Sequence, residues 1–133
     1  MTSGGSTIPS PASDTTTGMS VTFWGVRGSA PVSGLECMVF GGSTMCIEVE
    51  AGEHRIILDA GSGIRKLGQK LCNQKVSTVD IVLTHFHLDH GMGLTTFSPL
   101  FRNGTSVVVH APILQGEHPE LILHRLLGEP FFP

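Results

Sequence analysis

Residues 84–90, with the sequence THFHLDH, constrain this chain more than any other segment. They place three histidines and an aspartate within six positions, directly after the largely apolar run 79–83, which is typical of a short buried strand. Neutral imidazole and carboxylate are the ligand types that hold zinc and related divalent ions. A group of such ligands at the rigid end of a strand predicts a metal site, and specifically a site for two ions.

The spacing within this segment suggests how the ligands divide between the ions. Residues two apart on an extended segment point the same way, so His85 and His87 are expected to bind one ion together. Asp89 and His90 are expected to turn off the strand end toward a second ion. Without a cation, this crowding of polar groups would carry a cost that nothing evident offsets. The other histidines are expected to be ordinary surface or core residues: His54, His110, His118 and His124.

Composition limits the classes of function to consider. The chain has 133 residues, 40% of them hydrophobic, and a mean hydropathy of +0.20, which indicates one globular domain with a modest core. Eight basic against eleven acidic residues give a net charge of −3, so the electrostatic footprint of a protein that grips a long nucleic acid is missing. A small anionic substrate is compatible with this charge, because bound metal would supply positive charge locally.

Cysteine use and hydropathy favour a cytoplasmic protein. The three cysteines, Cys37, Cys46 and Cys72, show no CxxC spacing, and an odd, scattered set suits packing roles in a reducing compartment better than a disulfide framework. No apolar stretch approaches the roughly 20 residues that span a bilayer. The first residues also lack the features of a signal peptide. We therefore expect a cytoplasmic location and no membrane association.

The chain is expected to divide into a tail and one folded domain. Residues 1–18 are mostly Ser, Thr, Gly and Pro with a single charge, which predicts a disordered tail or vector sequence before a natural start at Met19. Strands are predicted over residues 20–24, 44–50, 54–58, 79–83 and 105–109, and the second and third of them form a hairpin. Residues 44–50 alternate apolar and polar side chains, the pattern of a half-buried strand.

Two helices are predicted between and after these strands. The first follows a tight turn at residues 59–63, with Ser62 as its N-cap and with Ile64, Leu67 and Leu71 on its buried face. The second covers residues 119–127. Strands and helices in this order favour a mixed α/β sheet covered by helices.

Four blocks of the sequence together resemble one protein family. They are THFHLDH at 84–90, FWGVRGSAP at 23–31, FGGST at 40–44 and LDAGSG at 58–63. The first resembles the HxHxDH signature of the metallo-β-lactamase superfamily. The others are similar to blocks of the branch related to ribonuclease Z and class II cyclic-nucleotide phosphodiesterases. The resemblance covers residues 19–133 and implies the N-terminal half of an αββα sandwich, of α/β (mixed α+β) class.

The resemblance also implies roles for individual residues. His85 and His87 would bind the first metal ion, and Asp89 and His90 the second. The implied cofactor is Zn²⁺, two ions per complete site, with Mn²⁺ or Fe as alternatives. A metal-bound hydroxide would be the nucleophile of a phosphodiesterase-like hydrolase, and Asp89 would have a catalytic role if it relays a proton to the leaving group.

Three further residues have expected roles, and for two of them alternatives stay open. Asp59 either orients a ligand histidine or caps the turn at residues 61–63. Thr84 is expected to fix the strand end through its hydroxyl. Arg27 either meets a phosphate or is a solvated loop residue.

The chain departs from the resembling family in length, because members are usually longer and their second half supplies the remaining ligands. We therefore expect the domain 19–133 to be truncated at its C-terminal end, and the full-length form to be an enzyme. The expected partners are a small phosphorylated or cyclic-nucleotide-like substrate, with RNA disfavoured by the acidic balance. A homo-oligomer, or association through the face left exposed on the half-fold, is also expected. The alternative is a truncated, non-catalytic metal-binding or interaction module that needs a partner chain to complete its site.

Overall fold

A computed structural model describes residues 18–130 of the chain. The predicted disordered tail, apart from Gly18, therefore lies outside the described residues. In chain order the elements are β1 (Met19–Gly25), η1 (Leu35–Cys37), β2 (Cys46–Ala51), β3 (His54–Leu58), α1 (Ile64–Gln74), β4 (Thr78–Val82), α2 (Leu88–Gly91), η2 (Met92–Thr96), η3 (Ser98–Phe101), β5 (Ser106–His110) and α3 (Pro119–Leu127).

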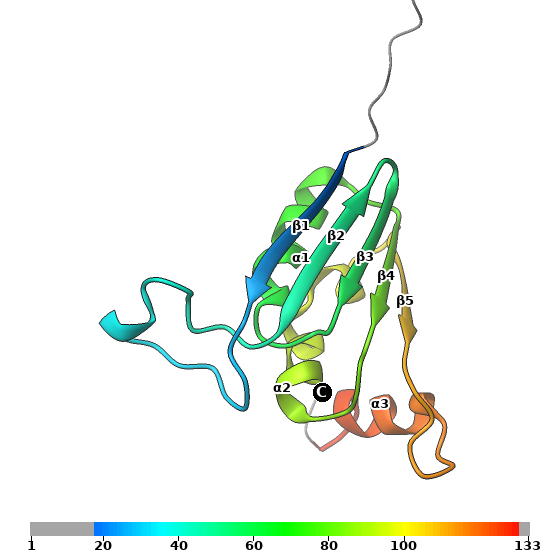
Figure 1. Cartoon of the computed structure of the whole chain (residues 1–133). Helices are drawn as coiled ribbons and strands as arrows, with labels where there is room; N and C mark the ends of the chain where they lie inside the picture. Colours follow the sequence, from blue (N-terminus) through cyan, green and yellow to red (C-terminus); the bar gives the residue numbers. More distant parts are fainter. Residues whose placement is uncertain (1–17, 131–133) are drawn as a thin grey trace, which may run out of the picture.

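The strands form one mixed sheet of five, ordered as in the sequence from β1 to β5 (Figure 1). β2 pairs antiparallel with both β1 and β3, and the predicted hairpin is β2 and β3. β3, β4 and β5 run parallel, with α1 crossing between β3 and β4. The mixed α/β class expected from the sequence is confirmed.

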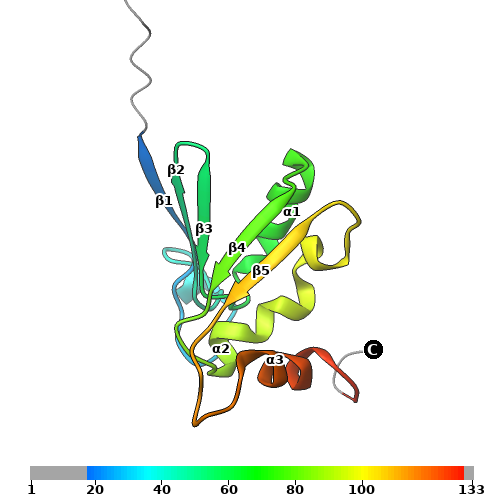
Figure 2. The same ribbon diagram turned by 90° about the vertical axis from the view of Figure 1, so that its right-hand side faces the viewer.

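One face of the sheet carries the hydrophobic core. Helix α1 and the short helices after β4 cover this face (Figure 2). The predicted apolar face of α1 is buried against the inward side chains of the central strands. The core residues shared by these elements are Cys46, Ile57, Ile64, Leu67, Leu71, Val79, Ile81, Leu94 and Phe97. Cys46 is fully buried, and this burial, followed by the nearby Glu48 and Asp59 charges, raises the pKa of its thiol to about 12. Its predicted packing role is confirmed.

The predicted N-cap of α1 is wrong. Gly63 occupies the N-cap position and no side chain caps the helix. Ser62 is instead paired with Thr44: its Oγ accepts a hydrogen bond from Thr44 N at 2.9 Å, and its own N–H donates to Thr44 Oγ1 at 2.8 Å. The hydroxyl therefore joins the segment just before β2 to the turn before α1, a contact that local spacing does not reveal.

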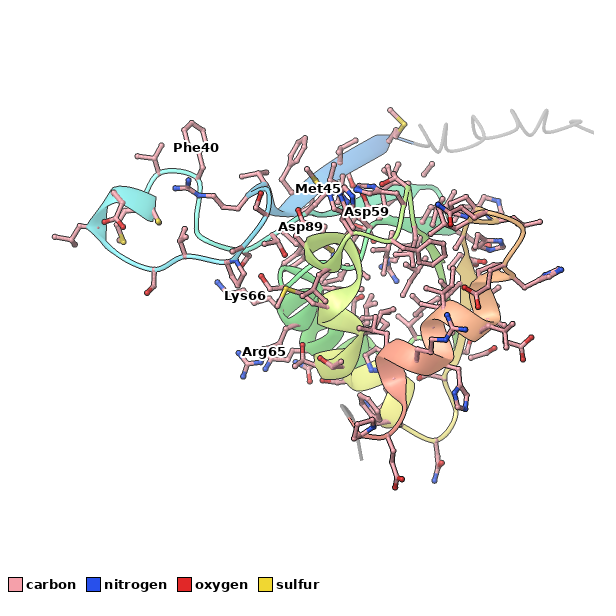
Figure 3. The ribbon with its side chains drawn as sticks, turned by 90° about the horizontal axis from the view of Figure 1, so that it is seen from below. Phe40, Met45, Asp59, Arg65, Lys66 and Asp89 are labelled. Atoms are coloured by element: carbon pink, nitrogen blue, oxygen red, sulfur yellow. The ribbon has the colours of Figure 1, made fainter. Side chains whose placement is uncertain are left out.

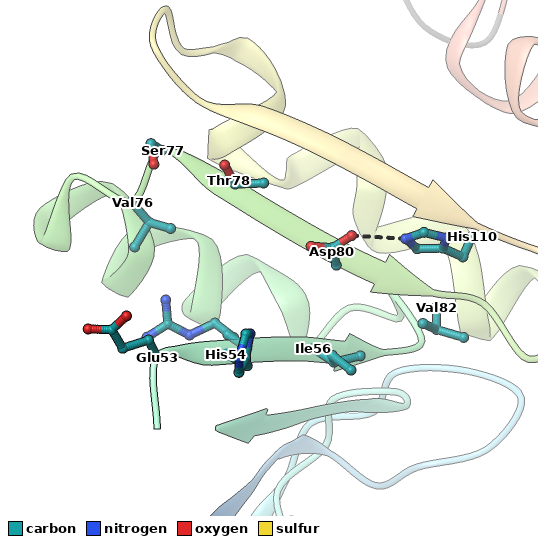
Figure 4. A pocket seen from close by; sticks show the side chains of 10 residues that line it. Glu53, His54, Ile56, Val76, Ser77, Thr78, Asp80, Val82 and His110 are labelled. Atoms are coloured by element: carbon teal, nitrogen blue, oxygen red, sulfur yellow. Dashed lines mark hydrogen bonds and ion pairs between the residues drawn. The ribbon is translucent and has the colours of Figure 1, made fainter. Parts of the chain in front are cut away.

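The opposite face of the sheet lies open and exposes several apolar side chains. Val21, Phe23, Ile56 and Val108 are between 41% and 63% exposed. A shallow depression of about 730 Å³ crosses this face, and His110 pairs with Asp80 at 2.9 Å beside it (Figure 4). Layered folds bury each apolar sheet face against another layer. This face is therefore a surface that a further layer would cover.

We predict that the isolated 133-residue chain self-associates through this open face. A Phe23→Lys substitution is expected to shift the chain toward monomer in sedimentation velocity, because it puts a charge in place of an exposed apolar side chain of this face. The matched control is Ile113→Lys, since Ile113 is similarly exposed (62%) but lies in the loop before α3. Monomeric behaviour of the parent chain at high concentration would contradict the prediction.

An arm projects from the body between β1 and β2. We use the name arm for residues 26–45, which include η1 (Figure 1). Its tip exposes four large apolar side chains by 77–88%: Leu35, Met38, Val39 and Phe40. Arg27 contacts Gly41 O and Cys37 Sγ, both at 3.4 Å, so its contacts lie within the arm.

A group of ion pairs on the covered face of the sheet is expected to make the stability of the fold partly dependent on acid pH. The hydrogen bond from Arg55, together with the charges of Arg55 and Lys70, holds the pKa of Glu50 below its ordinary value of 4.5. A lowered folded pKa gives stability that is fully present above the unfolded pKa and is lost as pH falls through the folded one. Glu50→Gln should therefore flatten the loss of stability below about pH 4.5 in urea titrations.

The size of this pH effect is expected to be small. Glu50 is 32% exposed, so solvent screening limits the contribution to about 1 kcal/mol or less. Glu53→Gln, in the exposed turn between β2 and β3, is the control. Parallel pH curves for the parent and Glu50→Gln would show that this pair adds nothing.

Within residues 18–130, no helix has the length and apolar character needed to cross a membrane.

Candidate metal centre

The motif residues lie where two parallel strands end side by side. β3 ends at Leu58 and β4 at Val82, and these two residues are register partners. Asp59 N donates to Val82 O at 2.9 Å just beyond that pair. Binding sites of open α/β sheets commonly form outside the carboxyl ends of the strands. The sheet thus brings Asp59 to the segment 84–90.

Asp59 is the point where several of these groups meet. It is only 4% exposed, and its Oδ1 accepts from Thr84 N at 2.8 Å. The Thr84 hydroxyl lies 3.0 Å from both Asp59 oxygens, so Thr84 fixes the strand end as expected. Asp59 Oδ2 lies 2.8 Å from His90 Nδ1. Of the two interpretations of Asp59, the contacts match the one in which it orients a histidine.

The conformation of Asp59 fits a shaped site. Its φ is 58°, a left-handed value that aspartate tolerates better than most residues. Gly61 follows in the same turn, where a Cβ would lie 2.3 Å from Asp89 O and 2.7 Å from Met45 O. Only glycine allows the turn to pass this close to the motif backbone. Ala60 N donates to His90 O at 2.7 Å and completes the contact between the two segments.

Three motif imidazoles form one group. The His85 ring centroid lies 4.4 Å from that of His87 and 4.0 Å from that of His90. His85 Nδ1 lies 2.9 Å from the Thr84 hydroxyl. His87 is exposed, while His85 and His90 are half-buried. The rings of His87 and His90 therefore both lie beside that of His85, and the predicted division of the ligands between two ions stays a prediction.

Asp89 joins this group from the first turn of α2. It is 8% exposed, and its Oδ2 accepts from Ser29 N at 2.8 Å and lies 3.5 Å from His90 Nε2. The Ser29 hydrogen bond, and then its own amide and the neighbouring histidines, hold the pKa of Asp89 below its ordinary value. Seen from below, Asp59 and Asp89 lie near the base of the arm, and Phe40 lies further out along it (Figure 3).

The chemistry of these donors fits a divalent metal ion. Imidazole and carboxylate are the ligands that zinc takes, and the Asp59 contact to a ring nitrogen is the kind that orients a ligand histidine. Within residues 18–130, however, no three His, Cys, Asp or Glu side chains converge closely enough to hold an ion. The donor set therefore fits a divalent ion in chemical kind, and further ligands or a local adjustment would be needed to complete the coordination.

Sequence reasoning missed Ser29 and located the other histidines correctly. Ser29 reaches Asp89 through its backbone amide, which carries no residue-type signal. The four remaining histidines are all exposed: His54, His110, His118 and His124. Their expected ordinary surface character is confirmed.

Comparison with known proteins adds evidence of ancestry. The family model described as "Metallo-beta-lactamase superfamily" matches residues 39–123, more than half of the chain. An uncharacterised protein of Synechocystis sp. is 34% identical over 90 residues, which are 67% of this chain and 14% of that protein. The atrochrysone carboxyl ACP thioesterase of Aspergillus aculeatus is 29% identical over 75 residues, or 53% of this chain and 24% of that enzyme. The chain therefore matches a quarter or less of the length of either relative.

A solved structure also shows similarity. It is a Thermotoga maritima protein assigned to the metallo-beta-lactamases, 25% identical, with a TM-score of 0.36 over 59% of this chain and 39% of that one.

Proposed function

The chain belongs to the metallo-β-lactamase superfamily, and we propose that it carries part of the metal site of a metal-dependent hydrolase. The observation that supports this most is that the rings of His87 and His90 both lie beside that of His85, with centroids 4.4 and 4.0 Å from it. Asp89 stands beside this group and Asp59 fixes one of its rings. The superfamily includes metal-dependent hydrolases, which gives this donor set a function.

Each residue then has a distinct task. His85, His87, Asp89 and His90 would hold metal ions, of which Zn²⁺ is the species that suits these donors best. When bound, such ions supply Lewis-acid activation of water and of the scissile group. Asp59 keeps His90 oriented through its 2.8 Å contact, and Thr84 holds Asp59 in turn. Asp89 could in addition accept or return a proton, as its position at the site edge allows.

We favour a phosphodiester as the substrate class. The blocks FWGVRGSAP and LDAGSG are similar to the phosphodiesterase-related branch, and both contribute residues to the site: Ser29 from the first and Asp59 from the second. A phosphodiester carries one negative charge that a dinuclear centre would neutralise. The net charge of −3 disfavours a long nucleic acid, so among phosphodiesters we favour a small phosphorylated or cyclic-nucleotide-like molecule.

A thioester is the second candidate, because one relative is an acyl-carrier-protein thioesterase at 29% identity. The two substrates separate in one assay series. The chain, loaded with Zn²⁺ or Mn²⁺, is offered bis-p-nitrophenyl phosphate and, in parallel, an acyl thioester whose free thiol is detected by colour. Phosphate-ester turnover that disappears in His87→Ala supports the phosphodiesterase proposal. Thioester turnover alone would replace it.

The alternative function is a non-catalytic metal-binding module, and the incomplete ligand set is the reason to consider it. It is favoured by the finding that, among residues 18–130, no ligand group already converges on an ion. Metal stoichiometry and mass in solution distinguish the two. Two tightly bound ions per chain indicate a completed dinuclear site, whereas one weakly bound ion, and no turnover of either substrate, indicate a module that needs a partner.

A further inference from the structure

A backbone hydrogen bond joins the root of the arm directly to Asp89 of the candidate metal centre. Ser29 N donates to Asp89 Oδ2 at 2.8 Å, although 60 residues separate the two in sequence. Asp89 is 8% exposed, so little water competes for that oxygen. A carboxylate offers about four acceptor sites on its two oxygens, and the contact leaves capacity for an ion.

The turn at Ser29 is strained in a way that serves this contact. Ser29 has a φ of 66°, and Ala30 N donates to Gly28 O at 2.9 Å across it. A three-residue turn with a positive φ at its centre is rare and costly for a residue other than glycine. Such strain persists where the surroundings enforce it, and it clusters at functional sites. Here it places the Ser29 N–H against Asp89.

The rest of the arm holds its root in place. Val26 N and Arg27 N both donate to Ser43 O, and Val32 N donates to Gly42 O at 2.9 Å. The two limbs of the arm meet so closely at Gly42 that a Cβ there would lie 1.7 Å from Val32 O. A change at Gly42 must therefore displace a limb of the arm, although Gly42 lies outside the metal centre.

We propose that Ser29 is a positioning residue, whose backbone amide orients the Asp89 carboxylate for metal binding and thereby links the arm to the metal centre. The inference rests on the proposed function, in which Asp89 is a metal ligand. Linkage is reciprocal, so metal binding also steadies the arm. Displacement of the arm then weakens metal binding without removing any ligand.

The test uses substitutions that act on the turn. Ser29→Val opposes the positive φ, because β-branched residues avoid it, and should weaken Co²⁺ binding by about 10–100-fold, the usual cost of losing an outer partner of a ligand. The Co²⁺ absorption bands should also change shape. Ser29→Gly keeps the N–H and permits the turn, so this variant should bind Co²⁺ with the affinity of the parent chain. Ser33→Val, the same change at another exposed arm residue without a positive φ, is the control.

A remote variant and a metal-free measurement complete the experiment. Gly42→Ala should also weaken Co²⁺ binding, through the arm alone. In metal-free protein, hydrogen exchange of the Ser29 amide should be slow in the parent chain and fast in Asp89→Ala, which reports the contact whether or not metal binds.

The outcomes separate the two proposals. If the parent binds no Co²⁺ while the Ser29 amide is protected, the proposed function fails and the contact is only structural. If Ser29→Val and Gly42→Ala bind Co²⁺ as tightly as Ser33→Val does, the positioning role is refuted even though the metal site stands. A Ser29 amide that exchanges freely in the parent chain refutes it as well.

Discussion

Replacing His87 with alanine is expected to lower the affinity of the chain for Zn²⁺ by at least about 100-fold. Loss of an outer hydrogen-bond partner already costs about 10–100-fold in metal affinity, and loss of a ligand removes a bond to the ion itself. The His87 ring lies 4.4 Å from that of His85, so its absence opens the imidazole group on one side. A competition titration against a coloured chelator measures the change.

This substitution should hardly change the stability of the fold. His87 is exposed, and exposed substitutions away from special features usually alter stability by less than about 0.5 kcal/mol. Thermal unfolding of the metal-free protein should therefore be unchanged, which separates loss of a ligand from loss of structure. His118→Ala, at an exposed histidine before α3, is the matched control. Equal Zn²⁺ affinity in both variants would remove His87 from the proposed ligand set.

Replacing Glu48 with alanine is expected to destabilise the fold by about 3 kcal/mol, the lower end of the cost of breaking a buried ion pair. Glu48 is fully buried in β2. Its carboxylate lies 2.9 Å from both Arg55 Nε and Lys70 Nζ, and Trp24 Nε1 donates to it at 3.0 Å. Without Glu48, two cations and an indole N–H lose their partner beneath α1. Arg55 and Lys70 are 18% and 31% exposed, so partial hydration limits the loss.

Urea unfolding of Glu48→Ala and Glu53→Ala measures this effect. Glu53 has the same side chain in an exposed turn, and its substitution should change the free energy of unfolding by less than about 0.5 kcal/mol. Glu48→Gln should fall between the two, because the amide can still accept from Trp24 but carries no charge. If Glu48→Ala lowers the free energy of unfolding by less than about 1 kcal/mol, the attraction between the buried charges hardly exceeds the cost of their desolvation, and the prediction is wrong.

Local patterns predicted most elements, because each depends on neighbouring residues. The spacing of Ile64, Leu67 and Leu71 marks the buried face of α1, and all three are buried there. The capping of α1 failed for the same reason: the Ser62 hydroxyl is taken by Thr44, 18 residues away. Local sequence propensity does not include a partner that is so distant in the sequence.

The alternation in β2 shows the limit of periodicity most clearly. It predicts a strand with two different sides, and the structure buries the side with Cys46 and Glu48 while Ile47 and Val49 are only half-buried. A polar residue can occupy the covered side because Arg55 and Lys70 neutralise it. The apolar side faces the open surface that a further layer would cover.

The sequence by itself determined that the proposed metal ligands His85, His87, Asp89 and His90 lie together, because they are near neighbours in the segment that follows β4. Only the tertiary structure decided what surrounds them. The contacts of Asp59 with Thr84 and of Ser29 with Asp89 span 25 and 60 residues. They form because parallel strands end at a shared edge and a strained turn of the arm returns to it. Contacts across such distances depend on how the chain packs, and no local pattern encodes them.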